Sequence, residues 1–292
     1  MGLTIHFSLR LPTSFTQDEA TASIAKLWQA CHRLPFQGQT VMVTLDEARI
    51  GAATTGEEAL ADWRWACIQH ERTLRYAHDS RGVPYVLGAE AKIPVSIHAR
   101  VQAKQLIGFS LMPGDGCEPL NIFVGVFPAS QMARCEGSQR GYPSGKRRLM
   151  LDTPLRWTGA AFTKTQYASV PEAGGITNFL RCHLLVVAAL DAARDLGFGV
   201  EVRDEGGYWS KRSVPDLVRE IGDWNAYLLA VGAQLKGVFG DQVQSALTPE
   251  RAAAPIDSGA AAALGDDVLD LIERTGGTCA TTPTAAAAAQ PL

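Results

Sequence analysis

Motifs that would assign a reaction are missing from this sequence. It contains no Cys-x-x-Cys pair, no zinc-ligand spacing, no P-loop, no Gly-x-Ser-x-Gly turn and no dinucleotide-binding glycine fingerprint. No metal site is therefore predicted, and no motif assigns a cofactor or a reaction to the chain.

Long apolar runs and targeting signals are also absent. No apolar run approaches the roughly 20 residues that a membrane-spanning helix needs. The first residues, Met-Gly-Leu-Thr-Ile-His-Phe, lack the basic region and the long apolar stretch of a secretory signal. The six cysteines are scattered along a chain of 292 residues, which is long enough to bury its own core. We therefore expect a soluble cytoplasmic protein with reduced thiols and no membrane contact.

The chain also lacks a strong charge of either sign. Its formal net charge is -3, with 46% hydrophobic and 20% charged residues, which is typical of a soluble globular protein. The exception is the segment 131–164, which holds seven bases and two acids. Arg140, Lys146, Arg147 and Arg148 in this segment could contact a phosphate backbone. A solvated loop is the favoured interpretation, so any binding of nucleic acid is expected to be weak and sensitive to salt.

Local patterns predict the elements of the first half. Alternating apolar and polar residues over 3–11 predict a half-buried strand, and Thr16-x-x-Glu19 is a capping box that predicts a following helix. The β-rich segments 93–100 and 104–111 are separated by a short polar break and predict a hairpin. Further strands are predicted over 41–45 and 122–127.

The second half has clearer helical patterns. If 157–168 is extended, Lys164 and Gln166 point to the same face. The segment 176–196 is apolar nearly all round, which predicts a central buried helix followed by a strand over 198–202. Ser213 caps a last long helix whose apolar residues follow a 4-3 spacing as far as Val238. Packing of this helix on the sheet is favoured over a coiled coil.

These patterns predict an α+β fold with mixed or antiparallel sheets and packed helices. We expect two lobes, over 1–130 and 157–240, joined by a basic Gly/Pro-containing connection over 131–156. The segment 241–292 is rich in Ala, Thr and Pro and is expected to be disordered, because it cannot bury enough apolar surface. Within it, 264–274 could form a short amphipathic helix, either free or docked.

Polar and titratable residues at strand ends and on the buried helix predict one shared site. His183, Glu205 and Lys164 are the candidate catalytic residues, with His183 or Glu205 moving protons and Lys164 or Arg212 holding charge. Turn-forming glycines and prolines nearby would let a substrate approach. The candidate substrate-binding residues are Gln166, Tyr167, Asp204, Trp209, Arg212, Glu118 and Asn121.

Plainer interpretations of the same residues stay open. Asp204 and Glu205 could pair with neighbouring bases in a solvated turn, and a histidine on an apolar stripe is more often part of the core than a base. Cys117 is the best-placed thiol by its loop position, but a nucleophilic role would require a histidine close in space.

Four motifs carry a resemblance to a family of uncharacterised bacterial proteins. They are Pro113-Gly-x-Gly-Cys-Glu118-x-x-Asn121, Thr165-Gln-Tyr-Ala-Ser169, Asn178-Phe-Leu-Arg-Cys-His-Leu184 and Asp204-Glu-Gly-Gly-Tyr-Trp209. The resemblance covers roughly residues 1–240. It implies no activity, and it fits one shared site as well as one shared fold.

Two hypotheses on function follow. The first is an enzyme doing acid-base chemistry on a small or phosphate-bearing substrate. The second is a non-catalytic binding module that recognises a ligand, a nucleic acid or a protein. Clustering of Lys164, His183 and Glu205 around a partly exposed pocket would favour the enzyme, whereas separate salt bridges would favour the module.

Overall fold

Seven antiparallel strands form the main sheet of the protein. The computed structural model describes residues 3–47, 49, 72–78, 84–86, 95–99, 103–127, 130–134, 148–152, 156–239 and 257–276. The strand order is β12-β1-β11-β8-β7-β2, and β3 also pairs with β7. The strands are β1 (Thr4–Arg10), β2 (Gly38–Gln39), β3 (Val43–Asp46), β7 (Gln105–Met112), β8 (Leu120–Val126), β11 (Arg156–Lys164) and β12 (Gly199–Asp204).

The sheet joins segments that lie far apart in the sequence. β1, near the start of the chain, lies between β11 and β12 and pairs with both in antiparallel register. The antiparallel sheet and the helices packed on it confirm the predicted α+β class. Residues 1–130 and 157–240 nevertheless contribute strands to one sheet, so the predicted division into two lobes is not seen there.

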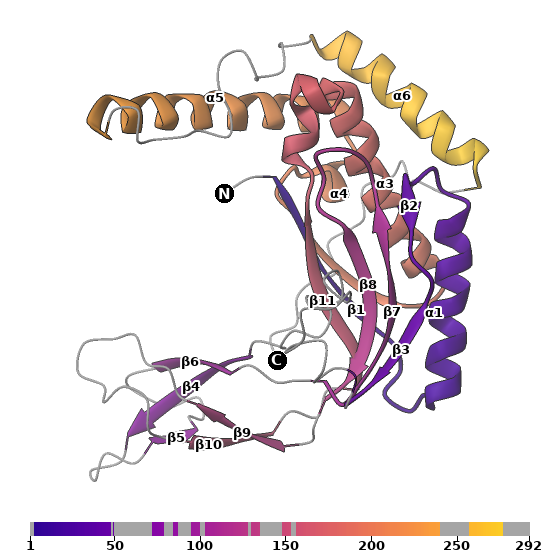
Figure 1. Cartoon of the computed structure of the whole chain (residues 1–292), viewed down its shortest axis with the longest axis vertical. Helices are drawn as coiled ribbons and strands as arrows, with labels where there is room; N and C mark the ends of the chain where they lie inside the picture. Colours follow the sequence, from indigo (N-terminus) through magenta and orange to yellow (C-terminus); the bar gives the residue numbers. More distant parts are fainter. Residues whose placement is uncertain are drawn as a thin grey trace.

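Helices cover one face of this sheet (Figure 1). Along β1, Ile5, Phe7 and Leu9 are buried, whereas His6 and Arg10 are exposed on the opposite face. The covering helices are α1 (Gln17–His32), which begins at the predicted Thr16 capping box, and α3 (Gly175–Asp195). The apolar layer between sheet and helices is the core of the protein.

α3 is the central helix that the apolar segment 176–196 predicted. It is long and apolar enough to cross a membrane, although no single apolar run in the sequence suggested this. However, 72% of its most apolar window is buried inside the protein, against the sheet and the other helices. Because most of this window is buried, α3 packs as a core helix of the protein.

The last helices pack on other helices rather than on the sheet. α5 (Val214–Phe239) begins beside the short α4 (Tyr208–Lys211) and contacts α3 and α6, so the predicted packing of α5 on the sheet is corrected. α6 (Ser258–Arg274) docks on α3 and α5 through the buried side chains of Ala261 and Ile272. Disorder was predicted for 241–292, but 258–274 form this docked helix; the remainder, apart from residues 257, 275 and 276, lies outside the described residues.

Two small sheets and two short helical turns complete the described part of the chain. β6 pairs with β4 and β7 pairs with β8, so 93–100 and 104–111 are strands but not the predicted hairpin. The ends of the predicted connection 131–156 are strands that pair with each other, while Arg140, Lys146 and Arg147 lie outside the described residues. The elements are β4 (Arg72–His78), β5 (Pro84–Val86), β6 (Val95–Ala99), β9 (Ser130–Arg134), β10 (Arg148–Asp152), η1 (Gln166–Ser169) and η2 (Pro171–Ala173).

Candidate functional site

Three neighbouring strands bring the candidate residues to one edge of the main sheet, meaning the side where these strands begin or end and not an edge strand. β1 starts at this edge and both of its neighbours end there, so Thr4 lies opposite Lys164 and Ile5 lies opposite Asp204. The backbone pairing continues one residue further, because the N–H of Thr165 donates to the carbonyl of Leu3 at 3.2 Å. This edge is where α3 passes over the sheet.

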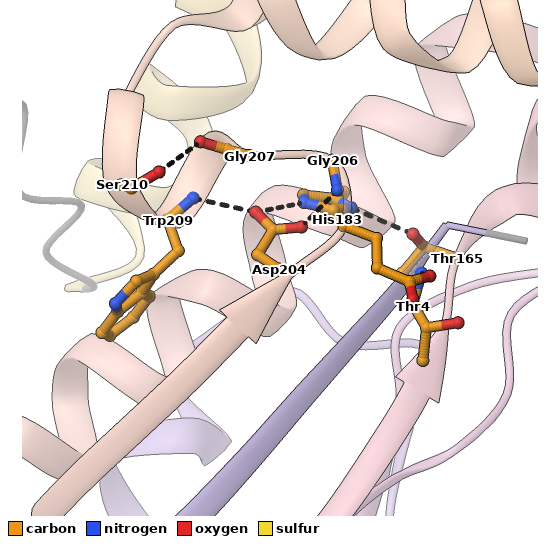
Figure 2. A network of polar contacts seen from close by, with 9 residues as sticks. Thr4, Thr165, His183, Asp204, Gly206, Gly207, Trp209 and Ser210 are labelled. Carbon is orange, nitrogen blue, oxygen red and sulfur yellow. Dashed lines mark hydrogen bonds and ion pairs between the residues drawn. The ribbon is translucent and has the colours of Figure 1, made fainter. Parts of the chain in front are cut away.

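His183 of α3 is held from both sides by hydrogen bonds (Figure 2). Its Nε2 lies 3.2 Å from Oδ2 of Asp204, and its Nδ1 lies 3.0 Å from Oγ1 of Thr165. Because an ionised carboxylate only accepts hydrogen bonds, Nε2 carries the proton that is donated to Asp204. We call Thr165, His183 and Asp204 the histidine network.

Asp204 ends β12 and organises the turn that follows. Its Oδ1 accepts from the N–H of Gly206 and its Oδ2 accepts from the N–H of Trp209, both at 2.8 Å. Burial alone would raise the pKa of Asp204, but the charge and hydrogen bond of His183, together with the two backbone N–H groups, lower that pKa below its usual value. The carboxylate is therefore held in its ionised form.

The histidine network is closed to solvent. Thr165 and His183 have no exposed surface, and the side chain of Asp204 is 2% exposed. Gly206 packs directly against the imidazole ring, because a Cβ there would lie only 3.1 Å from Cε1 of His183. Both ring nitrogens of His183 are engaged, so neither is left for a substrate. The arrangement fastens α3 to the sheet edge, as the interpretation of His183 as a core histidine implies.

The other two candidate catalytic residues pair elsewhere. Lys164 Nζ lies 3.3 Å from Oε1 of Glu118, with the two side chains 37% and 42% exposed. Glu205 accepts from the N–H of Thr4 at 3.1 Å and lies 3.8 Å from Nε2 of His6. The partner of His183 is thus Asp204 and not the adjacent Glu205, and the three candidates belong to three separate pairs.

The amide candidates are buried in networks of their own. Gln166 lies in η1 rather than on a strand, which corrects its predicted position beside Lys164, and its Nε2 lies 3.5 Å from Oδ1 of Asn225. Oε1 of Gln166 is buried without a hydrogen-bond partner among the described residues. Asn121 accepts from the hydroxyl of Ser110 at 2.8 Å, and Tyr167 is exposed.

Arg212 is not a free anion-binding residue. Its guanidinium makes two hydrogen bonds to Asp191 on α3, at 2.7 and 3.0 Å, and its side chain has no exposed surface. The same guanidinium lies 4.8 Å from the ring centroid of Trp209, and Arg194 contacts that ring at 5.3 Å. Arg212 and Trp209 therefore lock α4 onto α3, and their role in binding a ligand stays a prediction. In Figure 2 the indole of Trp209 points away from the histidine network.

Sequence reasoning missed three polar residues that complete these networks. Thr165 and Asn225 are buried partners of His183 and Gln166, and nothing local marks them. Asp191 did carry a signal, because it is the one acid in the apolar segment 184–193 of α3 and lies two turns beyond His183. A buried acid of this kind requires a cationic partner, which is Arg212.

No group of three or more His, Cys, Asp or Glu side chains suited to a metal ion occurs among the described residues. No protein-family model, no curated protein and no solved structure matches the chain. The resemblance to a bacterial family stays a prediction, and function has to be argued from the geometry.

Proposed function

We propose that the protein is a non-catalytic binding module of the cytoplasm, and that the distal half of α5 (224–239) binds a protein partner. The observation that carries this proposal is the exposure of large apolar side chains on one projecting helix. Six such side chains are exposed among the described residues, and three of them, Tyr227, Leu235 and Val238, belong to α5. Val238 is 74% exposed. Exposed apolar patches on soluble proteins mark interaction sites.

The two halves of α5 share one apolar seam but have different surroundings. Leu217 and Ile221 in the first half are fully buried against the other helices. The 4-3 spacing continues through Trp224 and Leu228 to Leu235, where the helix extends away from the sheet (Figure 1). A seam of this kind matches the apolar face of another helix, as in a coiled coil or a helix in a groove.

The composition of the distal half of α5 favours binding to an apolar surface of a partner. Between Gly222 and Phe239 the only charged residues are Asp223 and Lys236. Nucleic acids and acidic surfaces are bound mainly through clustered bases, which this helix lacks. The partner is therefore expected to present an apolar helical surface.

Site-specific photo-crosslinking tests this proposal. A benzophenone amino acid at Tyr227 is expected to give crosslinked protein species in host cells, whereas the same group at the exposed Gln29 of α1 gives none. Val238→Glu is expected to abolish the crosslinks from position 227. Light scattering on the purified protein then distinguishes a second copy from a different partner. Equal crosslinking at both positions, or none from Tyr227, would contradict the proposal.

The acid-base enzyme is the second candidate, and one observation favours it. Thr165, His183 and Asp204 follow the hydroxyl–imidazole–carboxylate order of an activated nucleophile. Because the network is buried, this function requires an opening of the sheet edge. A thermal-shift screen with metabolites and divalent ions tests it, with Asp204→Asn as the matched variant. A ligand that raises the melting temperature of the wild type but not of the variant would support the enzyme.

A further inference from the structure

β12 is the last strand on one side of the main sheet. Within the described part of the chain it pairs with β1 alone and has no strand on its other side, which we call the free edge. The strand contains neither proline nor lysine, two residues that often protect such edges. An unpaired edge presents backbone donors and acceptors to which another strand can bind.

The pairing with β1 determines which residues face the free edge. The N–H of Glu205 donates to the carbonyl of Thr4 at 3.1 Å, and bonded pairs alternate along an antiparallel ladder. The odd-numbered residues of β12 are therefore bonded to β1, whereas Val200 and Val202 direct their N–H and C=O groups to the free edge. These groups make no hydrogen bond there with any described residue.

The charges of β12 are complementary to those of a second, antiparallel copy. Glu201 and Arg203 are two residues apart and are both exposed, on the face opposite to the helices. Glu201 contacts Arg10 of β1 at 2.8 Å, whereas Arg203 has no ion-pair partner among the described residues. When two β12 strands lie antiparallel about Val202, each Glu201 lies opposite Arg203 of the other copy. Pairs of opposite charge in this position stabilise a sheet.

We propose that the protein forms a two-fold symmetric dimer through the free edges of two β12 strands. The main sheet then continues from one copy into the other. Val202 lies on the two-fold axis and is bonded to Val202 of the second copy, and the ladder continues to residue 200 of one copy and residue 204 of the other.

The same charges select this register of the two strands. A shift by two residues places Glu201 opposite Glu201, or Arg203 opposite Arg203 in the other direction. Like charges directly opposite each other destabilise a sheet. The complementary charges both lie on one strand, so a second copy of this chain fits the free edge without any further partner.

The dimer uses a different surface from the one proposed to bind a protein partner. None of the exposed apolar residues of α5 takes part in it. Val238→Glu, which is expected to abolish binding at α5, should therefore leave the β12 dimer intact. Failure of one proposal thus leaves the other standing.

Sedimentation velocity of the full chain over a range of concentrations tests the dimer. The wild type is expected to pass from monomer to dimer as the concentration rises. Arg203→Glu and Glu201→Arg are each expected to weaken the dimer about tenfold, because two attractive pairs become repulsive. Lys26→Glu, which reverses a charge on the exposed face of α1, is the matched control and should dimerise like the wild type.

An equal mixture of Arg203→Glu and Glu201→Arg tests the register. Two acids of one variant then lie opposite two bases of the other, so heterodimers are expected to form with about the strength of the wild-type dimer. A mixture that dimerises no better than its components would overturn the proposal. Variants that dimerise as well as the wild type, or loss of the dimer in Val238→Glu, would also overturn it.

Hydrogen exchange on the wild type gives a test that needs no variant. Peptides that cover β12 are expected to exchange more slowly at concentrations where the dimer forms than after dilution, because the amides of Val200 and Val202 become bonded. Peptides from α1 serve as the internal reference and should exchange equally at both concentrations. A wild type that stays monomeric at every concentration, or a dimer without added protection in β12, would contradict the proposal.

Discussion

His183 connects three elements of the fold through the hydrogen bonds of its two ring nitrogens. One ring nitrogen binds the carboxylate that ends β12, and the other binds a hydroxyl just after β11. The carboxylate in turn accepts two backbone N–H groups of the following turn. Every polar atom thereby receives a partner, which is what makes buried polar groups tolerable in a core.

The first prediction concerns the partner of this histidine. Asp204→Asn removes one charge of a buried pair and is expected to cost about 3–5 kcal/mol of the free energy of unfolding. Glu201→Gln is the matched control in the same strand, because the Glu201 side chain is 69% exposed in its pair with Arg10. It is expected to cost less than about 1 kcal/mol. Urea unfolding at neutral pH measures both, and equal losses would contradict a structural role for the network.

The second prediction concerns the pH dependence of stability. The pKa of Asp204 is lower in the folded protein than its usual 3.8, so the unfolded chain binds the proton more tightly. The stabilisation from Asp204 is therefore fully present above about pH 5 and is lost as the pH falls through the lower folded value. The difference in unfolding free energy between wild type and Asp204→Asn should be constant at higher pH and shrink below about pH 4. A difference that grows on acidification would have the wrong sign.

The choice between two adjacent carboxylates illustrates what the sequence could and could not predict. His183 was correctly predicted on a buried helix, but Glu205 was named as the second proton-transfer candidate. The alternation of Val200, Val202 and Asp204 along β12 puts Asp204 on the inward face, so this signal was present in the sequence. Thr165 could not be found in this way, because its contact depends on how distant strands pair.

At the scale of elements, local patterns predicted most helices and strands. The capping box at Thr16 and the apolar stripe of α3 were sufficient because such signals lie within one or two turns of the chain. It was harder to predict which elements pack against one another. The segment 241–292 was expected to be disordered because it cannot bury enough apolar surface, yet α6 docks on α3 and α5. A Cβ at Gly265 of α6 would lie only 2.6 Å from Cγ2 of Val214 on α5.

The third prediction follows from this docking of α6. Ile272→Ala is expected to cost about 2–5 kcal/mol, because the side chain is fully buried and its removal leaves a cavity. Glu273→Ala, at the neighbouring exposed position, should change stability by less than about 0.5 kcal/mol. Ending the chain at residue 245 should lower the melting temperature more than Ile272→Ala does, relative to a chain that ends at Gly276. Calorimetry measures these four chains and the wild type, and an unchanged melting temperature at 245 would mean that α6 adds nothing to the fold.

At the scale of the whole molecule, the main sheet is built from segments far apart in the sequence. β1 lies between β11 and β12, while β7 and β8 are neighbours both in sequence and in the sheet. No periodicity within a segment reports such long-range pairing, so the single sheet was predicted as two lobes. The class of the fold was predictable because it depends only on which elements exist.

The position of β1 in the sheet also determines when the protein can fold during its synthesis. β1 consists of residues 4–10, and its two neighbours, which are synthesised much later, consist of residues 156–164 and 199–204. The apolar side chains of Ile5, Phe7 and Leu9 therefore have no neighbouring strand until residue 164 has been synthesised, and β1 gains its second neighbour only at residue 204. Closing such long loops is slow, and exposed apolar segments of nascent chains aggregate. The main sheet is thus expected to be completed late, after residue 204 has been translated, and β1 is where a chaperone would have to bind.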